Sequence, residues 1–216
     1  KRIHEPSRDI PVVCDVDLCV VGGSATGVFA AVTASRLGLR VALVEAHGFF
    51  GGVATAGLVS VWHSILDTEH RQPIIGGLTV EFAERLKRRR GVVTVPGSDD
   101  IYYVLNTEEA KIEFDELVRE ARVRPFLHAR FADVALEDGR PVAAVIEDKS
   151  GRRAITARMF IDATGDGDLI ARAGLPFEKR EDPQPPTTCF IVRGLDAFIR
   201  NRPKFSLGSF LHEGRT

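Results

Sequence analysis

Between two apolar runs near the start of the chain lies a glycine-rich turn, and few folds accommodate that combination. Residues 16–21 are mostly apolar, the turn GGSATG follows at 22–27, and residues 26–37 are small or apolar all round before a glycine. Residues 41–44 are apolar again. Short apolar runs are typical of buried parallel strands, and small residues suit a helix pressed against a sheet. The pattern predicts a strand, a tight turn, a helix and a second strand joined as a right-handed βαβ unit.

Within this turn, each glycine has a separate physical role. Gly22 is expected to make the sharp turn, and Gly27 to let the helix pack closely on the strand. The start of the helix offers unpaired N–H groups and a positive dipole end to a diphosphate. Ser24 stands where such turns usually carry their middle glycine, and its hydroxyl could turn outward or donate to a phosphate oxygen. The alternative interpretation is a glycine turn that serves helix packing alone.

An acidic residue closes the second apolar run. Glu45 comes 18 residues after Gly27. A carboxylate at this strand end can accept hydrogen bonds from both hydroxyls of an adenosine ribose, and it would repel a 2′-phosphate. Taken alone, Glu45 is also compatible with a solvent-facing strand end. Together with the turn, it predicts a site for the ADP half of a dinucleotide.

At this point the sequence resembles a known family. The stretch from 17 to 55, with Gly27-x3-Ala31, Gly38, Glu45 and the pair Gly51-Gly52, resembles FAD-dependent oxidoreductases of the glutathione reductase and fumarate reductase superfamily. The resemblance implies FAD as the cofactor, with Gly51, Gly52 and Thr55 near the flavin. It also implies that redox chemistry belongs to the flavin ring, while the protein positions it.

A second segment resembles the same family. Residues 161–168, IDATGDGD, are similar to the ATG segment that returns the chain to the cofactor, and Ala132 is then expected to offer backbone groups to the adenine. The likeness covers about 17–174 and is weakest over 58–106. The residues expected to contact FAD are Gly22, Gly23, Ser24, Ala25, Thr26, Gly27, Glu45, Ala46, Gly51, Gly52, Thr55, Ala132, Ala163, Thr164, Gly165 and Asp166.

The rest of the pattern predicts an α/β fold. Residues 1–15 are expected to form an irregular arm, and helices are expected at 78–90 and 107–122, with Thr107 as N-cap. Three apolar segments, 126–136, 142–146 and 155–161, predict an antiparallel β-meander. The predicted architecture is a Rossmann-like FAD-binding domain, a parallel sheet plus this meander, over 1–57 and 107–173. Residues 58–106 and 174–216 are expected to form a partial substrate or cap domain.

Composition excludes several classes of protein. No apolar run reaches the roughly 18 residues that a membrane span needs. The net charge of −1 gives no general attraction to nucleic acid or to a membrane surface. The basic run 87–90 is explained by the end of a helix, where cations are favourable. Three irregularly placed cysteines do not make a disulfide framework, so we expect a cytoplasmic protein.

Other candidate sites receive weaker support from the sequence. Cys14 and Cys19 have the spacing of a redox disulfide, but Cys19 lies inside the first strand, where an inert buried thiol is expected. The acidic segment 162–168 lacks the ligand pattern of a calcium loop, so no metal is expected. His63 and His70 flank a polar loop as surface residues or as proton donors to a substrate. The spacing at His47 does not match a covalent flavin link.

The predicted function is flavin-mediated hydride or electron transfer with an unidentified small-molecule substrate, and no catalytic residue is assigned. The alternatives are a thiazole-synthase-like protein, which has the same fold and an NAD-derived adenylate, and a non-catalytic module that binds NAD or ADP. Because members of the family continue beyond this length, the expected partners are a C-terminal remainder of the same protein or a second copy of the chain.

Overall fold

The computed structural model describes residues 1–4, 6–94 and 101–202. Residues 1–183 form one compact unit and residues 184–216 form a second. In chain order the first unit contains β1 (Val12–Val21), α1 (Ala25–Arg36), β2 (Val41–Val44), the 3-10 turn η1 (Gly52–Ala54), β3 (Val61–His63), α2 (Leu78–Arg88), β4 (Val92–Thr94), β5 (Ile101–Leu105), α3 (Thr107–Glu120), β6 (Arg124–Phe126), β7 (Arg130–Glu137), β8 (Arg140–Asp148), β9 (Gly151–Asp162) and α4 (Asp168–Arg172). The described part of the second unit contains α5 (Leu195–Arg200).

The predicted α/β fold is confirmed by a six-stranded sheet. Its strand order is β6-β2-β1-β9-β8-β7. The first four strands run parallel, and β7, β8 and β9 form the antiparallel meander. β9 belongs to both parts, because it pairs with β8 near its start and with β1 along its later residues. The βαβ unit predicted from the glycine turn is β1-α1-β2.

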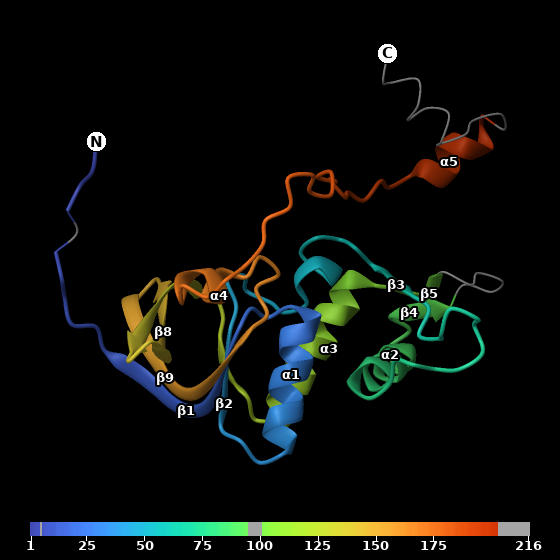
Figure 1. Ribbon diagram of the computed structural model, residues 1–216. Coiled ribbons are helices and arrows are strands. Elements are labelled where there is room, and N and C mark those ends of the chain that lie inside the picture. The colour runs from blue at the N-terminus through green and yellow to red at the C-terminus, as the bar shows by residue number, and fades with distance from the viewer. Residues whose placement is uncertain (5, 95–100, 203–216) are drawn as a thin grey trace. The chain divides into compact units, whose positions relative to one another are not determined.

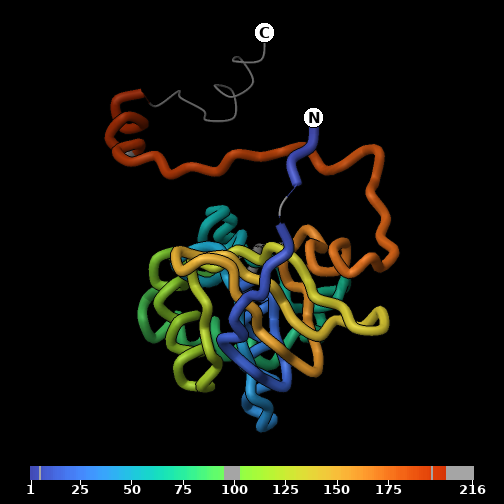
Figure 2. The backbone as a smooth tube through the Cα atoms, turned by 90° about the vertical axis from the view of Figure 1, so that its left-hand side faces the viewer, coloured from blue at the N-terminus to red at the C-terminus, as the bar shows by residue number. Residues whose placement is uncertain are grey.

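Both faces of the parallel strands are covered. Leu18 and Val20 of β1 point into a core shared with α1 and α3, whereas Cys19 and Val21 point into a second core that includes residues of the meander. Because successive side chains of a strand alternate between faces, a strand covered on both sides reads as one continuous apolar run. Figure 1 shows α1 and α3 together on one side of the sheet, and Figure 2 views the molecule from the side of the meander.

Three expected boundaries differ from the structure. β1 begins at Val12, so only residues 1–11 precede it; the polar residues between its apolar positions hid this part of the strand. The predicted strand 126–136 is two strands, since β6 pairs with β2 and β7 pairs with β8. The N-cap of α3 is Asn106 and not Thr107: its side-chain oxygen accepts hydrogen bonds from the N–H groups of Glu108 and Glu109, at 3.0 and 3.3 Å.

The segment 58–106 adds a small antiparallel sheet of order β3-β5-β4 and the helix α2. Buried residues of this segment, such as Phe82, Leu86 and Tyr103, belong to the same core as α1 and α3. The segment is therefore built onto the Rossmann-like body through a shared core. Its role as part of a cap stays a prediction.

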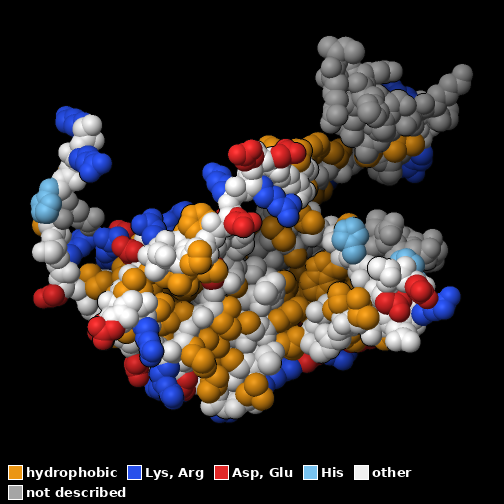
Figure 3. Space-filling model, in the orientation of Figure 1, with side chains coloured by type: hydrophobic (Ala, Val, Ile, Leu, Met, Phe, Trp, Pro, Cys, Tyr) orange, Lys and Arg blue, Asp and Glu red, His pale blue; other side chains and the backbone are white. Residues whose placement is uncertain are grey.

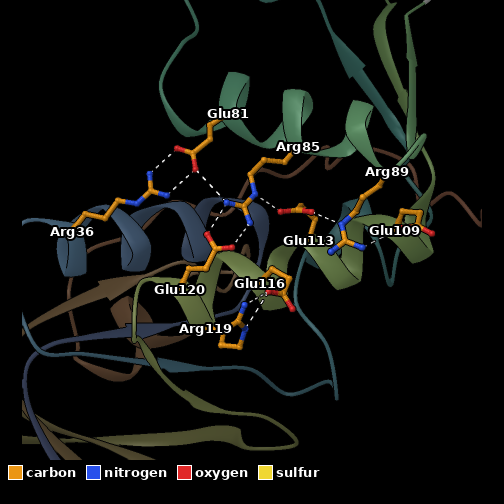
Figure 4. A network of polar contacts seen from close by, with 9 residues as sticks. All are labelled: Arg36, Glu81, Arg85, Arg89, Glu109, Glu113, Glu116, Arg119 and Glu120. Carbon is orange, nitrogen blue, oxygen red and sulfur yellow. Dashed lines mark hydrogen bonds and ion pairs between the residues drawn. The ribbon is translucent and has the colours of Figure 1, made fainter.

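Ion pairs also join α2 to the helices beside it (Figure 4). Glu113 of α3 is almost completely buried and contacts both Arg85 and Arg89 of α2. Arg85 also binds Glu120 at 2.7 Å. The basic end of α2 thus faces acidic groups of α3, which agrees with the interpretation of run 87–90 as a helix end. Among the described residues, every helix is too short or too polar to cross a bilayer.

Candidate functional site

The first and last glycines of the turn leave no room for a side chain. Gly22 has φ +102°, and a Cβ atom there would lie 2.3 Å from the carbonyl oxygen of Ala163. A Cβ atom on Gly27 would lie 1.9 Å from the carbonyl oxygen of Gly22. The first glycine therefore allows the end of β9 to approach the turn, and the last allows the first turn of α1 to sit against it.

Ser24 is the N-cap of α1 and is held by the protein. Its Oγ accepts a hydrogen bond from the N–H of Gly27 at 3.2 Å and donates to the carbonyl oxygen of Ala163 at 3.1 Å. In this structure the hydroxyl proton of Ser24 is therefore directed to Ala163, and its donation to a phosphate oxygen stays a prediction. Serine replaces the usual glycine here as a helix cap that also ties α1 to the end of β9.

Glu45 is buried, with 7% of its surface exposed, and its carboxylate is fixed at both oxygens. Oε2 accepts the N–H of Gly23 at 2.8 Å, and Oε1 accepts the N–H of His47 at 2.7 Å. A Cβ atom on Gly23 would lie 2.8 Å from Oε2, so this glycine is required for the contact. An ionised carboxylate has about four acceptor positions, and two remain after these bonds. The structure thus holds Glu45 in one orientation without using up its acceptors.

The segment after β9 is folded around a second carboxylate. Asp162 accepts the N–H and hydroxyl of Thr164 through Oδ1, at 3.0 and 2.7 Å. Its Oδ2 accepts the N–H groups of Leu169 and Ile170, at 2.9 and 3.0 Å. Burial alone would raise the pKa of Asp162, but the hydrogen bonds from Ile170, Thr164 and Leu169 outweigh it and hold the pKa below 3.8. Asp162 was not predicted as a site residue; its place between a strand end and a short helix is the signal of a capping carboxylate.

These segments surround a cleft of about 280 Å³ and a second hollow of about 600 Å³, and Ser24, His47, Gly52, Ala163 and Thr164 line both. Both lie where the parallel strands β1, β2 and β9 end, the edge at which open α/β sheets bind ligands. Ten of the predicted site residues line one or both hollows: Gly22, Ser24, Thr26, Glu45, Ala46, Gly52, Ala163, Thr164, Gly165 and Asp166.

Six predicted site residues lie outside both hollows. Gly23, Gly27, Gly51 and Thr55 are placed behind the lining; the hydroxyl of Thr55, for example, donates to the carbonyl oxygen of Phe50 at 2.8 Å. Ala25 lines a different cavity beside β3. Ala132 is the extra residue of a bulge in β7, between Phe131 and Asp133.

Residues that sequence reasoning missed also line the cleft. Ala129, Arg130 and Phe131 form its wall in place of Ala132, and His47 lines both hollows. Ala129 arrives there because its N–H donates to the carbonyl oxygen of Glu45 at 3.0 Å. Their only sequence signal was position, since they follow β6 at the same edge of the sheet as Glu45.

Cysteine chemistry and metal binding find no support in the described part of the chain. Cys14 and Cys19 are buried free thiols, and burial, with a smaller effect of Cys14, raises the pKa of Cys19 to about 12. The predicted burial of Cys19 is confirmed, and its low reactivity stays a prediction. Among the residues that the structure describes, no cluster of histidine, cysteine or acidic side chains is arranged to hold a metal ion.

Known proteins share both the sequence pattern and the fold. Residues 17–209 match the family model described as FAD dependent oxidoreductase. Mitochondrial dihydrolipoyl dehydrogenase of Schizosaccharomyces pombe is 29% identical over 86 residues, which cover 35% of this chain and 17% of that protein.

Solved structures resemble the chain over about three quarters of its length. A geranylgeranyl bacteriochlorophyll reductase-like protein of Thermoplasma acidophilum has a TM-score of 0.54 at 20% identity, covering 75% of this chain and 42% of that one. THI4 of Thermovibrio ammonificans has 0.53 at 22%, covering 73% and 61%. L-proline dehydrogenase of P. horikoshii has 0.56 at 12%, covering 78% and 58%. At these identities the likeness shows the fold alone, and the chain spans less than two thirds of each of these proteins.

Proposed function

Because the chain belongs to the FAD-dependent oxidoreductase family, we propose that the cleft binds the ADP half of FAD and that the second hollow takes the part of the cofactor leading to the flavin. The whole protein then catalyses flavin-mediated hydride or electron transfer with a small-molecule substrate. Ala129 to Phe131 would contact the adenine, Glu45 the ribose, and the start of α1 the diphosphate.

The orientation of Glu45 is the observation that carries this proposal. A buried carboxylate is stable only when hydrogen bonds compensate for lost solvation. Gly23 and His47 provide two such bonds and leave two acceptor positions at the cleft. A ribose with two adjacent hydroxyl groups matches those positions.

The backbone of the turn also fits the cofactor. Positions 22, 23 and 27 have no room for a Cβ atom, so the backbone of the turn packs closely against the residues around it. Ser24 occupies the N–H of Gly27, which leaves the earlier N–H groups of the first helical turn for a diphosphate. When bound, FAD supplies the ring that accepts electrons or hydride. The residues described here bind it, orient it and shield it from water.

Flavin binding is tested by the visible absorbance spectrum of the chain after incubation with FAD and removal of the free cofactor. We expect retained flavin in the native chain. In Glu45→Gln, the side-chain N–H₂ group would face the N–H of either Gly23 or His47, so that one hydrogen bond is lost. Losing a hydrogen bond to a charged group should weaken FAD binding about tenfold or more. Glu137→Gln is the matched control, since Glu137 is an exposed strand-end glutamate outside both hollows.

The alternatives make different predictions in the same experiment. A thiazole-synthase-like protein or an NAD- or ADP-binding module would retain a nucleotide without visible flavin absorbance. A non-catalytic FAD protein would retain flavin that no electron donor reduces under anaerobic conditions. Reduction of the bound flavin by one member of a donor panel would support the oxidoreductase. A cytoplasmic location, a C-terminal remainder and a second copy of the chain as partners also remain predictions.

A further inference from the structure

Arg130 begins β7 and lines the cleft proposed for the ADP half of FAD. Its backbone is held there, because the N–H of the preceding residue, Ala129, donates to the carbonyl oxygen of Glu45 at 3.0 Å. Figure 3 shows charged side chains of both signs over the part of the molecule that carries the meander, so exposed charges are common on this side. Arg130 is distinguished by its place at the cleft, where its side chain can contact a bound molecule.

The guanidinium group of Arg130 makes no ion pair or hydrogen bond with another side chain among the described residues. Glu147 lies opposite Arg130 on β8, a position from which oppositely charged side chains often interact. The two nevertheless form no ion pair. Asp166 and Asp168, which line the same cleft, form none with Arg130 either. The guanidinium group is therefore available to a ligand in the cleft.

The position of Arg130 selects the part of the ligand that it can reach. Arg130 and Phe131 line the cleft but not the second hollow, whereas Ser24 and Gly52 line both. The proposed cofactor runs from its adenine in the cleft, through the diphosphate, toward the flavin beyond the second hollow. Residues that line both hollows therefore lie beside the middle of the cofactor. Arg130 lies beside its adenine end.

The chemistry of this wall suits an aromatic ring. Ala129 and Phe131, on either side of Arg130, are apolar and also line the cleft. A guanidinium group is planar and weakly hydrated, so it can cover the face of an aromatic ring at a small cost in lost solvation. Such a contact contributes most where water is excluded, as it is inside an occupied cleft.

We propose that the guanidinium group of Arg130 stacks on the adenine ring of the nucleotide bound in the cleft, and that its planar face provides most of its contribution to binding. This inference rests on the proposed binding of the ADP half of FAD and adds to it the residue that covers the base. Arg130 is then a cofactor-contacting residue, which distinguishes it from the exposed arginines of the same sheet.

Binding of ADP to the full chain, measured by calorimetry, tests the proposal with three variants. Arg130→Ala removes the planar face, and ADP should bind about fivefold more weakly or worse. Arg130→Phe keeps a planar face without the charge, and its affinity for ADP should stay within about twofold of the native value, because aromatic rings also stack on bases. Arg130→Lys keeps the charge without the plane and should bind ADP as weakly as Arg130→Ala does.

Two controls accompany these variants. Arg140→Ala, at an exposed arginine that begins β8 and does not line the cleft, should leave the affinity for ADP unchanged. In the absence of nucleotide, the Arg130 variants should unfold at the same urea concentration as the native chain, because no side-chain contact of Arg130 is lost. The loss of affinity in Arg130→Ala should also be equal at low and high salt, since salt screens an ion pair with a phosphate but not a stacking contact.

Each other pattern contradicts the proposal. Affinity for ADP that is native in Arg130→Ala, or as low in Arg130→Phe as in Arg130→Ala, would overturn the stacking of Arg130. Native affinity in Arg130→Lys, or a loss that disappears at high salt, would show that Arg130 acts through its charge and would overturn the role of its planar face.

The flavin spectrum, recorded on the same samples, separates this proposal from the proposed function. Retained FAD together with native affinity for ADP in Arg130→Ala would overturn the stacking and leave the flavin function standing. The expected pattern with ADP in a chain that retains no FAD would support the stacking and overturn the flavin function. A native chain that binds neither ADP nor FAD would overturn both.

Discussion

A methyl group on Gly27 would lie 1.9 Å from the carbonyl oxygen of Gly22. Alanine is normally favoured over glycine inside a helix by about 1 kcal/mol. Here the clash must separate α1 from the turn, and overpacking of this kind costs about 1–3 kcal/mol or more. We therefore predict that Gly27→Ala lowers the free energy of unfolding, measured by urea denaturation, and weakens FAD binding.

Gly76→Ala is the control for this prediction. A Cβ atom at Gly76 would have no heavy atom within 4 Å, and the residue does not have a positive φ. Its unfolding midpoint should match that of the native chain. Equal midpoints for Gly27→Ala and Gly76→Ala would show that the turn has room for a side chain, contrary to the geometry.

The four hydrogen bonds accepted by Asp162 lead to a prediction about pH. The folded pKa of Asp162 lies below its ordinary 3.8, so its ionised form stabilises the fold above that pH, and this stabilisation is lost as the pH falls through the folded pKa. Asp162→Asn replaces one carboxylate oxygen, which accepts N–H groups, by an N–H₂ group, which cannot accept them. At pH 7 this variant should therefore be less stable by about 1–2 kcal/mol, the usual cost of a lost helix cap.

Urea denaturation across a pH series checks this prediction. The difference in unfolding free energy between the native chain and Asp162→Asn should be constant near neutral pH and shrink below about pH 4. Asp138→Asn, in an exposed turn at φ +50°, is the control, because asparagine tolerates that conformation and should cost little. A difference that stays constant down to the lowest pH would contradict the role of Asp162 as an ionised cap.

Sequence reasoning located the residues whose requirement is local. The turn at Gly22 and Gly27 follows from backbone geometry, and Glu45 follows from its place at a strand end. Contacts with a distant partner could not be predicted in this way: the hydroxyl of Ser24 donates to Ala163, 139 residues away. Ala132 is the extra residue of a bulge in β7 and does not line the cleft, a position that no local pattern predicts, and its contact with the adenine stays a prediction.

At the scale of elements, Glu113 is the polar link between α2 and α3 (Figure 4). Its carboxylate is 3% exposed and contacts Arg85 and Arg89. Glu113→Gln removes the charge that both guanidinium groups face, although Arg85 keeps Glu120. We predict a loss of about 1–3 kcal/mol in unfolding free energy, the usual cost of leaving a buried polar group without its partner.

Glu116→Gln, on the same helix, is the matched control. Glu116 pairs with Arg119 at the surface of α3, and exposed pairs of this kind are worth about 0–1 kcal/mol. High salt should reduce the small effect at Glu116 more than the effect at Glu113, because buried pairs are screened less. Equal losses of unfolding free energy for the two variants would show that the buried ion pairs of Glu113 stabilise the fold no more than an exposed ion pair does.

Strands and helices were predictable where their apolar residues follow a regular pattern. The apolar runs of β1 and β2 and the amphipathic helices α2 and α3 appear at the expected places. The sequence pattern of segment 126–136 predicts one strand because both of its halves are apolar. Only the pairing with β2 on one side and β8 on the other separates it into β6 and β7, and pairing over that distance is not encoded in local pattern.

For the whole molecule, the two cores show where stability comes from. Their buried members run from Cys14 to Leu169 among the described residues. All of these members belong to the first unit. The described part of the second unit, 184–216, includes Phe190, Ile191 and Val192, which are 73%, 69% and 55% exposed. An exposed apolar run of this kind favours aggregation.

We therefore predict that a chain ending at Pro183 keeps its fold and its flavin. Its unfolding free energy in urea should lie within about 0.5 kcal/mol of that of the full chain, as for changes away from a core, and its urea dependence should be unchanged, because the buried residues of both cores belong to the first unit. Removing the apolar run should also reduce aggregation at high protein concentration. A lower unfolding midpoint with a smaller urea dependence would mean that residues 184–216 bury surface against the first unit, and the stability of the FAD-binding fold would then depend on both units.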